Sequence, residues 1–240
     1  MRSPDRPSFF RENLPMLLGL AVTAVAITLT GIFFGQSFWR ILPLYVSLAV
    51  ALLQSRMNRY ASLLGSINSL VYAAVYFYYR LYASAAYAVL VSCPVQVVTF
   101  VRWSKKPWGS STVFRKLSGK ARLFLLLGSV LAEALLLAVL ILTGGSHTLL
   151  DSSITLIGIL TSLLTMLSYI EYAPLMVLNG VLSIVLYLTM LGEHPEQTTY
   201  LCFTLYSLTS STVAFFRIRK LYEEQRKASS SPESVGEGPD

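Results

Sequence analysis

The strongest constraint on this chain is a series of eight apolar runs, each about 20 residues long. One such run crosses the ~30 Å of hydrocarbon in a bilayer as an α-helix, and the runs lack the short alternating pattern of an outer-membrane barrel. We therefore predict an all-α integral membrane protein with eight transmembrane helices. Their expected positions are residues 13–35, 39–55, 60–79, 82–103, 121–143, 149–168, 171–190 and 199–217.

Little of the chain remains for a soluble domain. Hydrophobic residues make up 54% of the 240 residues, charged residues only 13%, and the mean hydropathy is +0.60. The first run, 13–35, follows three arginines and so resembles a signal peptide. It exceeds the ~7 to 15 apolar residues of a cleaved signal, however, and lacks an obvious A-x-A-like site. We predict that it is retained as an extra helix.

The net charge of +7 comes from basic residues that gather on one side of the predicted helices. Of the 19 Lys and Arg residues, all except Arg40 and Arg80 fall on the side that holds both termini. Because cytoplasmic loops collect Lys and Arg, this distribution explains the charge without a nucleic-acid partner. It predicts a multi-pass protein of the cell membrane, with segments 1–12, 104–120 and 219–240 in the cytoplasm.

Two of these cytoplasmic segments carry further expectations. The loop 104–120 combines basic residues with Trp108 and Phe114. It is typical of a positive-inside loop with aromatic interface anchors, and docking on anionic lipid headgroups is the alternative. The tail 219–240 passes from mixed charges into a Ser-, Gly- and Pro-rich end, which predicts disorder because it has too little apolar surface to fold.

The cysteines and histidines do not suggest catalysis or metal binding. Cys93 and Cys202 fall within predicted helices, where buried free thiols are expected. His147 and His194 fall in short connections, without the Cys or carboxylate spacing of a metal site. The chain has no H-E-x-x-H motif. We therefore predict no metal, no cofactor and no enzymatic activity.

Two of the apolar runs keep amide and phenol side chains in a similar order. One contains Asn68 and Tyr72, and the other contains Asn179, Ser183 and Tyr187. Lipid offers such groups no hydrogen-bond partner, so they usually face protein or a polar cavity. The pattern predicts a duplicated polar lining of a transport path.

The order of the helices also repeats. Two three-helix units, 39–103 and 149–218, are joined by one connecting helix at 121–143, which gives both units the same orientation. Parallel repeats of this kind place a substrate site near the midplane, between the two units. The helix at 13–35 lies outside this scheme.

Taken in order, these residues resemble the nicotinamide riboside transporter family, the PnuC type, whose fold is related to that of the SWEET sugar transporters. The resemblance is strongest over residues 58–103 and recurs over 151–222. It runs through Tyr60, Gly65, Asn68, Tyr72, Tyr87, Gln96 and Trp103 in the first stretch, and Gly158, Glu171, Ser183, Tyr187, Tyr206 and Ser210 in the second.

The resemblance implies a 3+1+3 helix core that passes a B-vitamin, typically nicotinamide riboside, down its gradient into the cell. It also implies a cytoplasmic vitamin kinase that traps the substrate, and assembly as a homotrimer. A membrane scaffold or sensor that does not transport is the competing class of function.

The chain departs from the family where specificity should be set. The family has E-x-W-x-x-W at the start of the helix that corresponds to 171–190, but here Ala173 and Met176 stand at the two Trp positions. Tyr172 is a candidate replacement for the lost stacking surface. The family's Asn aligns with Gly180, one residue after Asn179, and one residue is a ~100° rotation on a helix. Thiamine, riboflavin and other nucleosides therefore remain alternative substrates.

The candidate substrate-binding residues come from several helices. Asn68, Tyr72 and Tyr76 lie at intervals of four, so they share one helix stripe that is either ligand-lining or a polar helix–helix contact. Gln96 follows Pro94, and its amide either borders the site or satisfies the bent helix. The full set is Asn68, Tyr72, Tyr76, Gln96, Tyr172, Asn179, Ser183 and Tyr206.

One carboxyl group, Glu133, falls in the middle of the predicted connecting helix. An ionisable group at this depth is by default a candidate for proton coupling. The alternative is an acid that is hydrogen-bonded across a helix contact. We favour the structural role, because the helix is a connector and the resemblance implies transport without ion coupling.

Overall fold

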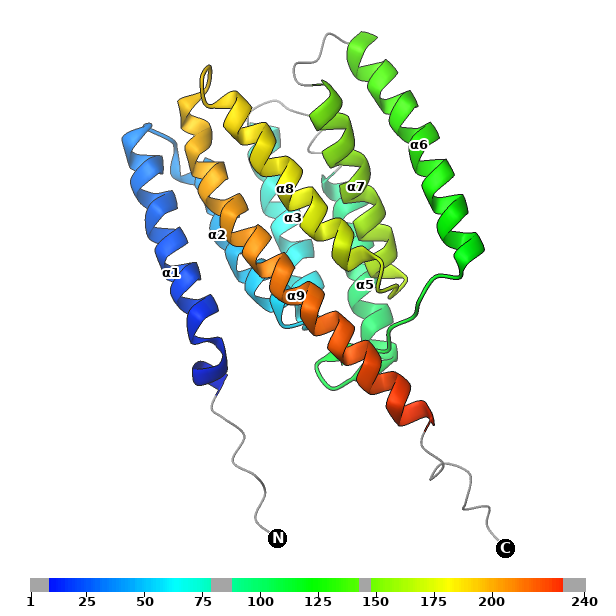
Figure 1. Cartoon of the computed structure of the whole chain (residues 1–240). Coiled ribbons are helices and arrows are strands. Elements are labelled where there is room, and N and C mark those ends of the chain that lie inside the picture. The colour runs from blue at the N-terminus through cyan, green and yellow to red at the C-terminus, as the bar shows by residue number, and fades with distance from the viewer. Residues whose placement is uncertain (1–8, 79–87, 143–147, 231–240) are drawn as a thin grey trace, which may run out of the picture.

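The computed structural model describes residues 9–78, 88–142 and 148–230, without the side chains of 9–13, 76, 78 and 140 (Figure 1). It is an all-helical bundle, as predicted. The α-helices of this part of the chain are α1 (Phe9–Phe33), α2 (Phe38–Ser55), α3 (Tyr60–Tyr78), α5 (Cys93–Lys105), α6 (Gly119–Leu142), α7 (Thr148–Met166), α8 (Tyr172–Met190) and α9 (Thr198–Ser230).

Six of the described helices are long and apolar enough to cross a membrane: those at Leu14–Phe33, Phe38–Ser55, Gly119–Val139, Thr148–Met166, Tyr172–Met190 and Pro195–Ser230. In α3 the apolar stretch is the shorter Tyr60–Val75. The predicted span 82–103 begins outside the described residues and continues as a π-helical turn, Ala88–Ser92, that leads into α5. Pro94 stands in the first turn of α5, directly after the π-helical turn.

Helices that follow one another run in opposite directions, so the start of α1 and the end of α9 lie at the same end of the bundle (Figure 1). α2 packs against α3, and α3 against α5; α7 packs against α8, and α8 against α9. Contacts of α2 with α9 and of α5 with α7 join these two groups. The relation of the two groups as internal repeats stays a prediction.

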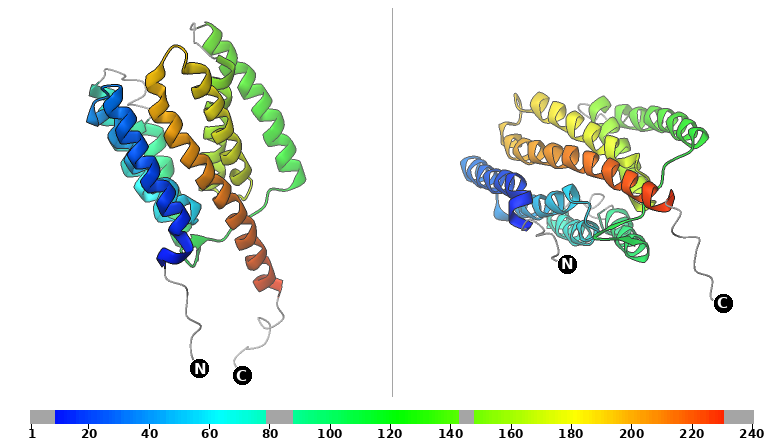
Figure 2. Two further views of the ribbon diagram at one scale, coloured as in Figure 1. Left: turned by 60° about the vertical axis from the view of Figure 1, so that its left-hand side comes forward. Right: turned by 60° about the horizontal axis from the view of Figure 1, so that its bottom comes forward.

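The two remaining helices lie at the edges. α1 packs on α2 and α9, and α6 packs on α7. α6 stands at the rim in both views of Figure 2, and none of its most apolar window is buried. A helix that is apolar on all sides and this exposed is suited to lipid or to protein contact within the membrane.

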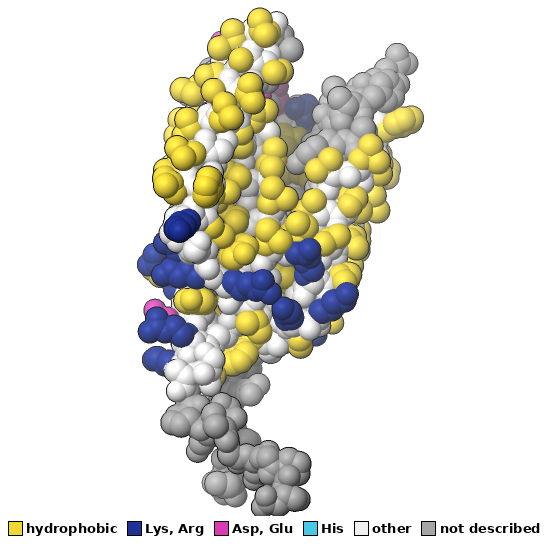
Figure 3. Space-filling model, turned by 90° about the vertical axis from the view of Figure 1, so that its right-hand side faces the viewer, with side chains coloured by type: hydrophobic (Ala, Val, Ile, Leu, Met, Phe, Trp, Pro, Cys, Tyr) yellow, Lys and Arg dark blue, Asp and Glu magenta, His cyan; other side chains and the backbone are white. Residues whose placement is uncertain are grey.

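Basic residues gather at one end of the bundle, which we call the basic end. It holds the turn between α2 and α3, the loop between α5 and α6, and the last turns of α9. Figure 3 shows Lys and Arg side chains in a belt below a broad hydrophobic surface on one face of the bundle. We call the opposite end the far end.

The loop at the basic end is more ordered than a plain connector. β1 (Pro107–Trp108) and β2 (Ser111–Thr112) form an antiparallel hairpin, and Gly109 adopts a φ of +57° in its turn. Farther along, the Arg115 backbone pairs with the turn between α7 and α8: its N–H donates to Ser168 O at 2.9 Å and its carbonyl accepts from Ile170 N–H at 2.9 Å.

The predicted disordered tail is wrong for residues 219–230, because α9 continues to Ser230. Leu221 and Tyr222 pack against the buried cluster at the basic end. The Gln225 side chain is only 8% exposed; its Nε2 donates to Thr112 O at 2.9 Å and its Oε1 accepts from Phe114 N–H at 2.9 Å. The helix is therefore stabilised by a tertiary contact that the composition of the tail does not reveal. Residues 231–240 lie outside the described part.

Candidate functional site

Two adjacent cavities lie between the helix group α2, α3, α5 and the group α7, α8, α9. The basic-end cavity has a volume of about 250 Å³ and the far-end cavity about 420 Å³. Gln54 from α2 and Thr161 from α7 line both cavities. The two cavities therefore meet at these side chains and follow the direction of the helices from one end of the bundle toward the other.

Aromatic rings close the basic-end cavity on the side of the loop. The rings of Trp103, Phe114 and Tyr172 contact one another, with centroids 5.7 to 6.5 Å apart. We call these three residues the aromatic floor. Trp103 Nε1 donates to Thr165 O at 3.0 Å, and Tyr172 OH donates to Met57 Sδ at 3.6 Å. All three residues are at most 5% exposed, so the aromatic floor is closely packed. The polar atoms of Trp103 and Tyr172 both have hydrogen-bond partners.

Gln96 stands in the wall of the basic-end cavity. Its Nε2 donates to Ser69 Oγ at 2.8 Å and to Ser92 Oγ at 3.2 Å, and the two hydroxyls bond each other at 2.9 Å. The backbone of Gly65 makes room for it, because a Cβ at that position would overlap Gln96 Oε1. Gln96 thus ties α3 to the π-helical turn through side-chain hydroxyls and also lines the basic-end cavity. A role in substrate binding stays a prediction.

The far-end cavity has polar and aromatic walls. It is lined by Tyr72, Asn179 and Ser183 from the predicted set, together with the stacked rings of Tyr187 and Tyr200. Asn179 Nδ2 donates to Ile154 O at 2.9 Å, and Ser183 Oγ donates to Asn179 Oδ1 at 3.4 Å. These bonds fix the amide of Asn179 toward α7.

Gln54, Thr161 and Met176 separate the two cavities, and we call them the septum. Gln54 Nε2 donates to Met176 Sδ at 3.3 Å, while Thr161 Oγ1 is buried and has no hydrogen-bond partner among the described residues. An unpaired buried hydroxyl that lines a cavity can bond a polar ligand at little cost. Gln54 and Thr161 were not among the candidate binding residues predicted from the sequence. The only available signal was a lone amide and a hydroxyl within apolar runs.

Two predicted binding residues lie elsewhere. Asn68 is 7% exposed, and its Nδ2 donates to Ser47 Oγ at 2.8 Å across the contact between α2 and α3. Tyr206 packs beside Gly19 of α1, and its hydroxyl donates to Met16 O at 3.4 Å. Neither lines either cavity. The side chain of Tyr76 lies outside the described residues.

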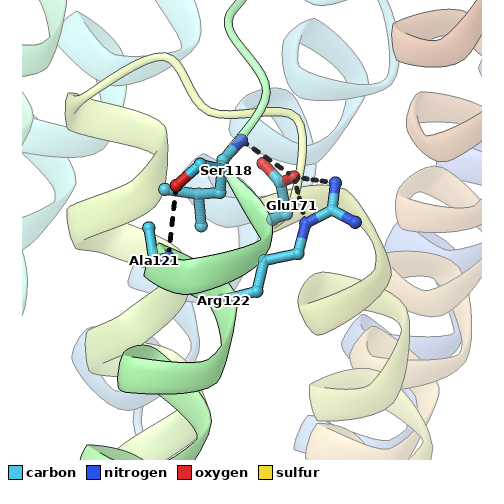
Figure 4. A network of polar contacts seen from close by, with 5 residues as sticks. Ser118, Ala121, Arg122 and Glu171 are labelled. Atoms are coloured by element: carbon cyan, nitrogen blue, oxygen red, sulfur yellow. Dashed lines mark hydrogen bonds and ion pairs between the residues drawn. The ribbon is translucent and has the colours of Figure 1, made fainter.

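The two carboxyl groups singled out by the sequence lie away from the cavities. Glu133 Oε1 accepts from the hydroxyls of Ser152 at 2.6 Å and Ser153 at 2.8 Å, which joins α6 to α7. Glu171 faces the basic end, where its Oε1 forms an ion pair with Arg122 at 2.7 Å and accepts from Leu117 N–H at 3.1 Å (Figure 4). Both groups connect elements of the fold.

The described residues include no group of three His, Cys, Asp or Glu side chains that could hold a metal ion. Cys93 and Cys202 are free and partly buried. In the same part of the chain, no Asp, Glu, Lys, Arg or His lines either of the two cavities. Their polar groups are amides, hydroxyls and phenols, which suit an uncharged polar ligand or an aromatic cation.

The family model for nicotinamide mononucleotide transporters matches residues 37–218, three quarters of the chain. The chain belongs to this family. The predicted membership of the PnuC family is thus confirmed. No curated protein matches the sequence.

The fold is also that of a solved family member. The structure described as the crystal structure of the vitamin B3 transporter PnuC superposes with a TM-score of 0.72, at 21% sequence identity, and the match covers 92% of this chain and 94% of the other. The coverage includes the part of the chain before residue 37, so the fold extends beyond the matched family region.

Proposed function

We propose that this protein mediates facilitated diffusion of nicotinamide riboside, through the path formed by the basic-end cavity, the septum and the far-end cavity. The carrying observation is that Gln54 and Thr161 line both cavities. A ligand that moves from one cavity to the other has to pass these two side chains. The far-end cavity, at about 420 Å³, lies within the ~300 to 1,000 Å³ of typical small-molecule sites.

The chemistry of the walls supports a riboside over a mononucleotide. The described walls contain no Lys or Arg, so a phosphate group entering them would lose hydration without a compensating charge. A riboside presents hydroxyls to Gln54, Thr161 and Asn179. Its pyridinium ring carries a positive charge that suits the faces of Tyr187 and Tyr200.

The lost tryptophans bear on the alternative substrates. Met176 lines the far-end cavity, whereas Ala173 is 2% exposed in the buried cluster and lines neither cavity. Tyr172 lines the basic-end cavity and offers a ring there. This rearranged aromatic surface keeps thiamine, riboflavin and other nucleosides as the competing substrates.

The distribution of charged residues supports a membrane orientation for the protein and a mode of transport. The basic end faces the cytoplasm by the positive-inside rule, so uptake runs from the far end to the basic end. The uncharged cavity walls and the structural bonds of Glu133 favour transport without proton coupling. A cytoplasmic vitamin kinase would trap the product, and the assembly implied by the resemblance is a homotrimer.

The test is uptake by purified protein in liposomes with a panel of nicotinamide riboside, nicotinamide mononucleotide, thiamine, riboflavin and nucleosides. We expect nicotinamide riboside to equilibrate across the bilayer without exceeding its external concentration, and the mononucleotide to stay outside. The same compounds are tested for thermal stabilisation, since a ligand at 100 times its Kd adds about 2.7 kcal/mol to the folded state. If no compound enters and none stabilises the protein, the transport proposal fails and a scaffold or sensor role gains support.

A further inference from the structure

A third cavity lies at the basic end, outside the transport path. It has a volume of about 220 Å³ and is enclosed by the end of α5, the loop after it and the turn between α7 and α8. Its lining residues include Arg102, Lys105, Lys106, Val113, Arg115 and Ser168. We call it the basic cavity.

Backbone hydrogen bonds hold its walls together. Val113 N–H donates to Lys106 O at 3.1 Å, which ties the loop to the end of α5. Arg115 N–H donates to Ser168 O at 2.9 Å, which ties the loop to the turn before α8. These bonds hold the backbone of the segments that carry the four basic residues, although the side chains themselves are exposed.

The charge of this cavity is uncompensated. Arg102, Lys105, Lys106 and Arg115 line it without a carboxylate, and none of these side chains has an ion pair or hydrogen bond within the described part of the chain. The neighbouring cavity beside α9 differs, because its Arg122 is paired with Glu171 and it also contains Glu223. Four like charges around one small space repel one another, and a bound anion removes that repulsion.

The surroundings of the basic cavity match a lipid. On α5, Val97, Val98 and Val101 are 40 to 42% exposed, immediately before the basic residues that end the helix. Acyl chains can lie along this apolar face while the headgroup reaches the cavity. The belt of Lys and Arg beneath the hydrophobic surface in Figure 3 has the arrangement expected at a headgroup layer.

We propose that the basic cavity binds the phosphate headgroup of an anionic phospholipid. The bound headgroup joins the end of α5, the loop and the turn between α7 and α8. These elements hold Trp103 and Phe114 of the aromatic floor, so the lipid stabilises the closed side of the transport path. This site does not depend on which substrate is carried.

The experiment measures thermal stability and lipid binding of the purified full chain in neutral detergent. The probes are dioctanoyl phosphatidylglycerol, dioctanoyl phosphatidylcholine and inorganic phosphate. We expect phosphatidylglycerol alone to raise the melting temperature. The double variant Arg102→Gln/Arg115→Gln should raise the Kd for phosphatidylglycerol about 10-fold or more, since each basic residue near an anionic headgroup adds to the binding free energy.

The matched control is Lys220→Gln/Lys227→Gln, which removes the same charge from exposed positions at the same end, outside the basic cavity. It should keep wild-type binding. Equal loss in both double variants would overturn the proposal in favour of diffuse attraction. Equal stabilisation by inorganic phosphate would assign the site to a soluble anion and overturn the lipid. If the first variant does not fold, Lys105→Gln/Lys106→Gln replaces it, with the same expected loss.

Discussion

The amide of Gln54 on α2 donates a hydrogen bond to the sulfur of Met176 on α8 at 3.3 Å, at the point where the two cavities meet. A thioether is a weak acceptor, so a ligand hydroxyl or amide can displace it at small cost. From the sequence, a family tryptophan is expected at the position of Met176, so in that alignment a thioether contact takes the place of an aromatic surface.

Replacing Gln54 with Ala removes a donor and acceptor from the septum. We expect the Kd for the transported substrate to rise about 2- to 10-fold, because one hydrogen bond to a neutral group contributes about 0.5 to 1.5 kcal/mol. Calorimetric titration with the best compound of the uptake panel measures it. An unchanged Kd together with unchanged uptake would remove Gln54 from the path.

Asn68→Ala is the contrasting variant, since Asn68 bonds Ser47 and lines neither cavity. Loss of this buried amide should destabilise the fold by about 1 to 3 kcal/mol, because the Ser47 hydroxyl loses its partner. The substrate Kd should stay at its wild-type value once the protein is folded. A rise in Kd as large as that of Gln54→Ala would return Asn68 to the binding site.

Gly65→Ala tests the close approach of α3 to Gln96. The new Cβ would overlap Gln96 Oε1, so the bonds of Gln96 to Ser69 and Ser92 should break, with a loss of about 1 to 3 kcal/mol. The double variant Gly65→Ala/Gln96→Ala should be about as stable as Gln96→Ala alone, because the overlap is gone once the Gln96 side chain is removed. Additive losses in the double variant would contradict this account. Thermal unfolding in detergent compares all three.

Glu133→Gln separates a structural carboxylate from a coupling one. An amide oxygen can still accept a hydrogen bond from Ser152 or Ser153. The variant should therefore remain folded, with a stability loss limited to about 1 to 2 kcal/mol. The pH dependence of uptake into liposomes should remain that of the wild type. A pH profile that flattens in the variant would instead assign proton coupling to Glu133.

Gln225→Ala tests the contact that orders the end of α9. The variant leaves Phe114 N–H and Thr112 O without their partner in a buried position, which should cost about 1 to 3 kcal/mol. Hydrogen exchange should accelerate in the loop 106–118 and in the last turns of α9. Glu224→Ala, at the adjacent exposed position, is the control and should leave exchange unchanged.

The sequence by itself determined where six apolar helices long enough to cross a membrane lie and which end of the bundle is basic. These properties depend on local runs, because a ~30 Å hydrocarbon layer acts on consecutive residues and the charge rule acts on the loops between them. The ordered aromatic and amide residues were also enough to indicate the family.

The tertiary structure decided which polar side chains face the cavities. Asn68 and Gln54 are both amides in apolar runs, and only the rotation and packing of α2 and α3 turn one into a helix contact and the other into the septum. The order of the α9 end likewise rests on Gln225 reaching backbone groups more than a hundred residues away. Such contacts join residues far apart in sequence, so no local pattern encodes them.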